Sequence, residues 1–113
     1  MTNEIEIESG ILYSKTDFSV IAKVCNKFGY KLQDFTKVLE QPDQLSYLFF
    51  KSIERGFQLE KKVLDYKEDK AEDLLCECYA EFMTAFNMDC LMMATTKKQR
   101  VEIEEEKKRM NIK

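Results

Sequence analysis

Apolar residues recur at helical spacing through the middle of the chain. Counting from Leu45, positions i, i+3, i+4, i+7 and i+8 form one side of a helix, the spacing typical of a packed face. Pro42 suits the first helical position because its φ is fixed and it lacks an N–H, and Asp43 complements the positive end of the helix dipole. Gly56 stands where a left-handed cap would end the helix. The sequence therefore predicts a helix from Pro42 to Arg55 whose packed side consists of Leu45, Leu48, Phe49, Ser52 and Ile53.

Three further segments carry helix signals. Thr16 or Asp17 can cap a helix that Gly29 would end. A short stripe follows and stops before Pro42, because the residue before a proline is pushed out of the helical conformation. After a short turn or helix over residues 59–66, the longest segment has apolar residues on one face and mainly acidic residues on the other. The three stripes are Phe18, Ile21, Ala22, Cys25 and Phe28; Leu32, Phe35, Val38 and Leu39; and Ala71, Leu74, Leu75, Cys78, Phe82, Ala85 and Phe86.

The first residues follow a different period. Ile5 and Ile7 alternate with glutamates, Ser9-Gly10 is a turn dipeptide, and residues 11–13 can return as a second strand. A two-stranded hairpin is marginal alone and needs helices beneath it. We therefore expect a mainly α fold: a compact bundle of four to five helices with a possible short N-terminal β-hairpin. The predicted domain spans residues 1–94, and residues 95–113 form a charged C-terminal helix or tail. The residues expected at the centre of the core are Leu48, Phe49, Ile53, Leu74, Cys78 and Phe82.

Composition and charge narrow the function classes. The 113 residues are 44% hydrophobic and 35% charged, and no apolar run reaches the roughly 18 residues that span a bilayer. The first residues lack the basic and apolar regions of a secretory signal, so we expect a cytoplasmic protein with no membrane partner. The net charge of −3 is unevenly distributed: residues 57–94 hold four basic and nine acidic residues, and residues 95–113 hold seven basic and four acidic ones. This asymmetry suggests contacts within or between chains as readily as with nucleic acid. Because four glutamates dilute the basic residues of the last segment, nucleic acid is an unlikely partner.

The residues needed for common catalytic and metal sites are missing. The chain has no histidine, and its glycines are isolated, so neither a histidine base nor a phosphate-binding loop can be built. Cys76 and Cys78 point about 200° apart on a helix, which favours free buried thiols over a shared metal or a disulfide. Carboxylates four residues apart, such as Asp69 and Asp73, indicate a solvated face, with a metal-dependent enzyme as a minor alternative. We expect no enzyme activity, cofactor or metal.

Two groups of side chains are candidates for binding another protein. On the Pro42 helix, Phe50 lies near the edge of the packed arc, Tyr47 lies almost opposite, and Phe57 extends the Phe50 patch. Either this helix is central and buried on several sides, or these rings line an exposed apolar groove for a partner helix. The second group lies near the end of the long helix, where flexible thioethers form either ordinary core or an adaptable surface. The predicted partner-binding residues are Tyr47, Phe50, Phe57, Met88, Met92 and Met93.

The order of these elements resembles the small tail assembly chaperones of long-tailed bacteriophages. The resemblance covers roughly Ile5 to Phe86: a hairpin, a helix, a short helix ending in Leu39, a Leu-x-x-Leu-aromatic helix closed by Gly56, and an acidic helix with Phe82. It rests on element order and apolar spacing. It implies a chaperone that keeps the tape measure protein soluble, recruits tail tube subunits and leaves before the virion matures, with possible self-association, in the host cytoplasm. The alternative is a small helical virion component, or a phage-encoded inhibitor that docks on one protein partner.

Overall fold

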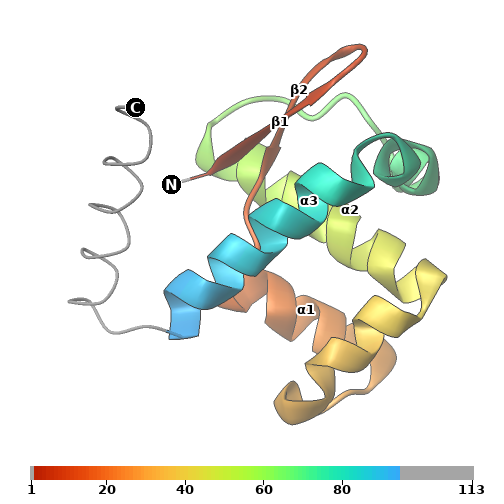
Figure 1. Ribbon diagram of the computed structural model, residues 1–113, viewed down its shortest axis with the longest axis vertical. Helices are drawn as coiled ribbons and strands as arrows, with labels where there is room; N and C mark the ends of the chain where they lie inside the picture. The colour runs from red at the N-terminus through yellow and green to blue at the C-terminus, as the bar shows by residue number, and fades with distance from the viewer. Residues whose placement is uncertain (1, 95–113) are drawn as a thin grey trace.

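The computed structural model describes residues 2–94, which form a two-stranded hairpin followed by helices (Figure 1). The fold is mainly α with a short N-terminal hairpin, as the sequence predicts. The predicted extension, residues 95–113, lies outside the described residues. In chain order the elements are strands β1 (Asn3–Ile7) and β2 (Gly10–Ser14), helix α1 (Phe18–Phe28), the 3-10 helix η1 (Leu32–Glu40), helix α2 (Pro42–Leu59), the 3-10 turn η2 (Glu68–Lys70) and helix α3 (Ala71–Ala94).

Local sequence signals fix several of these boundaries. The Asp17 carboxylate accepts a hydrogen bond from the Val20 N–H at 3.2 Å, so Asp17 is the N-cap of α1. Gly29 ends α1 with a left-handed φ of 72°. Pro42 begins α2. In each case the chemistry of the boundary residue is local, and the sequence prediction is confirmed.

The hairpin has the alternation expected of a strand pair with one packed face. The strands are antiparallel, and Ile5 is paired with Leu12 in their register. Both of these side chains are buried, whereas Glu4 and Glu6 are exposed. The buried face packs on the helices, because β2 contacts α2 and β1 contacts α3.

Helix α2 lies at the centre of the molecule. It contacts β2, α1, η1 and α3, and therefore buries residues on more than one side. At its core the Phe49 ring meets the Phe82 ring of α3 edge-on, with 5.0 Å between the ring centroids. Five of the six predicted core residues are buried, and Leu74 is partly exposed: the buried ones are Leu48, Phe49, Ile53, Cys78 and Phe82.

The structure corrects the predicted role of Gly56. Helix α2 continues past it to Leu59, and the residue with a left-handed φ is Lys61, at 57°. A Cβ at position 56 would overlap the backbone carbonyl of Tyr13 on β2. Glycine is required here because two backbones approach closely, which is a different use of the missing side chain from the predicted helix cap.

Two stripe assignments at element ends are also wrong. Phe18 is 63% exposed, and Leu32 is exposed as well. Each is the first residue of its helix, α1 or η1. The apolar face of each helix turns toward the core after its first residue, so helical spacing alone assigns these two side chains to the core incorrectly.

Candidate functional site

Phe50 and Phe57 belong to the core, so they do not line an exposed groove. Their exposed fractions are 7% and 9%. The Phe57 ring packs edge-on against Tyr13 of β2, with 5.3 Å between the centroids, and the Lys51 ammonium lies 5.9 Å from the centre of the Phe50 ring. Because β2 and α1 cover a second side of α2, a wheel with a single buried face misplaces both rings. Of the two alternatives for this helix, the buried one describes the structure.

Tyr47 lies elsewhere on α2 and is half-buried. Its ring packs edge-on against Phe28 of α1 at 5.3 Å, and the ammonium groups of Lys27 and Lys51 lie 5.7 and 5.3 Å from its centre. Phe50 and Phe57 line the floor of one hollow, whereas Tyr47 lines another. The structure therefore does not bring the three predicted aromatic residues together in one groove.

The predicted methionines lie on the last two turns of α3. Met88 and Met92 are partly exposed, and Met93 is exposed. Met88 lines a hollow of about 630 Å³ beside β1, together with Thr2 and Ile5. This hollow contains none of the three predicted aromatic residues, so the two predicted groups form separate surfaces.

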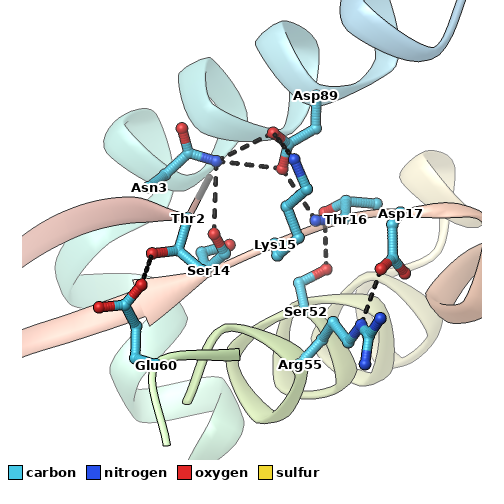
Figure 2. A network of polar contacts seen from close by, with 10 residues as sticks. All are labelled: Thr2, Asn3, Ser14, Lys15, Thr16, Asp17, Ser52, Arg55, Glu60 and Asp89. Carbon is cyan, nitrogen blue, oxygen red and sulfur yellow. Dashed lines mark hydrogen bonds and ion pairs between the residues drawn. The ribbon is translucent and has the colours of Figure 1, made fainter. Parts of the chain in front are cut away.

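A buried carboxylate fixes this end of α3 to the start of the chain (Figure 2). Asp89 accepts two hydrogen bonds from the Asn3 side-chain amide, at 3.0 and 3.1 Å, and one from the Thr16 N–H at 2.8 Å. The Lys15 ammonium lies 3.7 Å from the same carboxylate. The Thr16 hydroxyl in turn bonds the Ser52 hydroxyl of α2 at 2.7 Å. All of these partners belong to the chain itself, so the network connects β1, the segment between β2 and α1, α2 and α3.

A groove with apolar walls lies between η1, the start of α2 and the first half of α3. Its volume is about 450 Å³. Tyr79 stands at its edge and is 50% exposed, whereas Leu45 and Leu75 are buried. The apolar groove, as we call it below, is lined by Leu39, Glu40, Pro42, Leu45, Ser46, Glu72, Leu75, Cys76 and Tyr79.

A kink in α3 shapes this groove. Cys78 has φ −131° and ψ 29°, outside the helical region, and α3 changes direction there (Figure 1). The Cys78 thiol donates a hydrogen bond to the Leu74 carbonyl at 3.2 Å. Leu75 and Cys76 precede the kink and Tyr79 follows it, so the groove is lined from both sides of the bend.

A second hollow adjoins the apolar groove. It has a volume of about 380 Å³, and it shares Ser46 and Glu72 with the groove. We call it the acidic hollow, because four of its lining residues are carboxylates and one is a lysine. Its lining is Lys27, Phe28, Asp43, Ser46, Tyr47, Glu68, Asp69, Ala71 and Glu72.

The described part of the chain contains free thiols, but no metal-binding cluster and no membrane-spanning helix. Within residues 2–94 no group of three or more Cys, Asp or Glu residues is placed to hold a metal ion. The four cysteines are free: Cys25 and Cys78 are buried, Cys90 is partly exposed and Cys76 is exposed. Burial raises the pKa of the Cys78 thiol to about 11, and the nearby Glu81 and Glu77 add to the rise. No helix in this range is long and apolar enough to cross a membrane.

Several groove residues belong to the apolar stripes of the sequence, but the stripes do not predict that these residues lie together. Leu39, Leu45 and Leu75 appeared in three separate stripes, and Tyr79 in none. The available signal was Tyr79 itself, an aromatic residue off the apolar face of its helix. Comparisons of this chain with family models, with curated proteins and with solved structures find no match.

Proposed function

We propose that this chain is a non-enzymatic protein-binding module that holds an apolar helical segment of a partner. The tail assembly chaperones of long-tailed phages, which the element order resembles, act on the tape measure protein in this way. The apolar groove between Leu45 and Tyr79 carries the proposal. It combines apolar walls, an open mouth and an aromatic side chain at the edge.

The groove has the features of helix-in-groove recognition. In that mode a partner helix inserts apolar side chains spaced three or four residues apart into a hydrophobic groove. Tyr79 supplies a large amphipathic ring at the edge, and such rings often contribute 2 kcal/mol or more to an interface. Leu45 and Leu75 lie beneath and provide apolar surface that is already ordered, so little conformational freedom is lost at these positions on binding.

A small groove also suits the reversible binding that a chaperone needs. A hollow of about 450 Å³ receives a few side chains rather than a whole interface. Weak contacts of this size hold a client tightly only when several copies act along it, because linked sites raise the effective concentration. Such an assembly can also release its client one contact at a time.

The test uses a labelled peptide of about 18 residues, designed as a helix with leucine on one face and glutamine on the other. We expect the chain to bind this neutral peptide, measured by fluorescence anisotropy. Tyr79→Ala should weaken binding about tenfold or more. The matched control is Phe18→Ala, which also truncates an exposed aromatic residue on a helix but lies outside the groove. No binding by the unmodified chain, or equal losses in the two variants, would refute the proposal.

The alternative, a virion component, differs from a chaperone because it stays in the finished particle. If a phage encodes this chain, mass spectrometry of infected-cell lysate and of purified particles separates the two readings. A chaperone is expected in the lysate and absent from the particles. Stoichiometric amounts in the particles would identify a structural component instead.

A further inference from the structure

We propose that the groove's partner is a basic amphipathic helix, whose lysine or arginine side chains occupy the acidic hollow while its apolar face fills the apolar groove. This inference rests on the proposed function and adds the chemical class of the partner. The two hollows share Ser46 and Glu72, so they form one continuous surface across the starts of α2 and α3. One ligand can therefore contact both.

The charge along this surface is strongly one-sided. Among the described residues that line the two hollows, Lys27 is the one basic residue, against five carboxylates. The five belong to η1, α2, η2 and α3, so they are spread along the surface rather than gathered at a point. They are Glu40, Asp43, Glu68, Asp69 and Glu72.

Within residues 2–94, none of these five carboxylates forms a salt bridge. The hollow lined by Phe50 and Phe57 provides a contrast. Its described lining includes four basic residues, and two of them are already paired within the chain. There Lys51 pairs with Glu54 at 2.9 Å, and Arg55 pairs with Asp17 at 2.7 Å. Two cations of that hollow are thus paired within the chain, whereas the carboxylates of the acidic hollow remain available to a cation from outside; Glu68 helps raise the pKa of Lys51 but forms no salt bridge with it.

Ser46 offers a polar group at the junction of the two hollows. It is 8% exposed and lines both hollows, at the junction between them. Its hydroxyl makes no side-chain hydrogen bond within the described residues, and because it is not a buried unpartnered atom it is open to the hollows, where water can bond it. A lysine or arginine N–H crossing the junction would supply a donor to this oxygen.

A polycationic helix fits this arrangement better than a metal ion. The described carboxylates include no cluster of three placed to hold a metal. A helix offers several cations about 5.4 Å apart along its axis, a spacing that suits carboxylates distributed over several elements. Complementary charge at the edge of an interface mainly sets the partner's identity and its rate of association.

The test compares two labelled peptides with the same leucine face as the neutral peptide, one with lysine and one with glutamate on the other face. We expect the lysine peptide to bind at least about tenfold more tightly at about 50 mM salt, with the difference shrinking at about 500 mM salt. Removing three carboxylates of the acidic hollow should abolish most of that preference. The variant is Glu68→Gln, Asp69→Asn, Glu72→Gln.

The matched control removes three exposed carboxylates from the hollow beside β1, so it changes the net charge equally: Glu4→Gln, Glu6→Gln, Glu81→Gln. It should keep the preference for the lysine peptide. Equal losses in the two triple variants would show that overall charge acts, and would overturn the inference. Tight binding of the neutral peptide without a lysine preference would overturn it too, while leaving the proposed function intact.

A second copy of the chain is the other occupant that the experiment detects. Sedimentation velocity on the full chain and on the acidic-hollow variant measures self-association directly. A monomer in both cases supports a separate partner. A dimer that is lost in the variant, together with absent lysine-peptide binding, would assign the surface to self-association and overturn the inference.

Discussion

Replacing Gly56 by alanine tests whether α2 and β2 are in backbone contact. In an ordinary helix interior this change is favourable by about 1 kcal/mol, because alanine has the higher helix propensity and restricts the unfolded chain. Here the new Cβ would overlap the carbonyl of Tyr13 and the amide nitrogen of Ser14. These are backbone atoms of a paired strand, so rotating a side chain cannot relieve the overlap.

The expected loss follows from what must move. Overpacking a filled site costs about 1–3 kcal/mol, and a backbone neighbour places this site at the upper end of that range. Shifting β2 away also strains the hydrogen bond from the Lys15 N–H to the Ser52 carbonyl, now 2.9 Å, which contributes about 1 kcal/mol. After the favourable helix term is subtracted, we expect a net loss of about 2–3 kcal/mol. That lowers Tm by about 8–24 °C for a domain of this size.

Thermal unfolding followed by circular dichroism measures the change, and asparagine variants sharpen the result. Asparagine tolerates a left-handed φ, so Gly29→Asn at φ 72°, where a Cβ meets no neighbour, should cost little. Gly56→Asn should cost at least as much as Gly56→Ala. If Gly56→Ala raises Tm, or if asparagine is better tolerated than alanine at position 56, then Gly56 is not in contact with β2 and this account of the fold is wrong.

Three further predictions concern the core and the thiols. Phe49→Ala should lower the unfolding free energy by about 3–5 kcal/mol in urea titrations, because the ring is fully buried against Phe82; a loss below about 1 kcal/mol would contradict that packing. Phe57→Ser should lower the unfolding free energy by about 3 kcal/mol or more in the same assay, because it removes a buried ring and places a hydroxyl in its space. An unchanged unfolding free energy would show that this ring is exposed. In folded protein at pH 8, a thiol reagent should modify the exposed Cys76 first and Cys78 only on unfolding, because Cys78 is buried and a pKa of about 11 keeps its thiol protonated. Mass spectrometry of the labelled peptides measures the order of modification. Early labelling of Cys78 would contradict its burial.

The parts of the fold that sequence predicts well are those decided by local chemistry. The Asp17 cap, the Gly29 end of α1 and the Pro42 start of α2 each depend on one residue and its immediate backbone. Gly56 shows where this reasoning stops. A glycine near the end of a helical stripe is compatible with a cap or with a close approach, and the choice depends on β2, which lies more than forty residues earlier.

The candidate site was harder to predict because it depends on how distant elements pack. Phe50 and Phe57 were misplaced because α2 is covered by neighbours on several sides, which a single helix does not reveal. The groove needs η1, α2 and α3 together, and its shape depends on the kink at Cys78. Neither proline nor glycine occurs in α3 to signal that kink.

The hydrogen bonds between Asn3 and Asp89 have a consequence for synthesis of the chain. They join residues 86 positions apart, and contacts of such long sequence separation form late because a large loop must close first. As the nascent chain leaves the ribosome, the hairpin and α1 emerge well before the turn of α3 that carries Asp89. Until that turn arrives, the Thr16 N–H lacks its carboxylate acceptor, and the Asn3 amide keeps only its bond to the Ser14 carbonyl at 3.4 Å. A chain cut before Asp89 would retain most of the aromatic core but could not complete this connection, and it would stay open to proteases at the very strands that the intact protein fastens last.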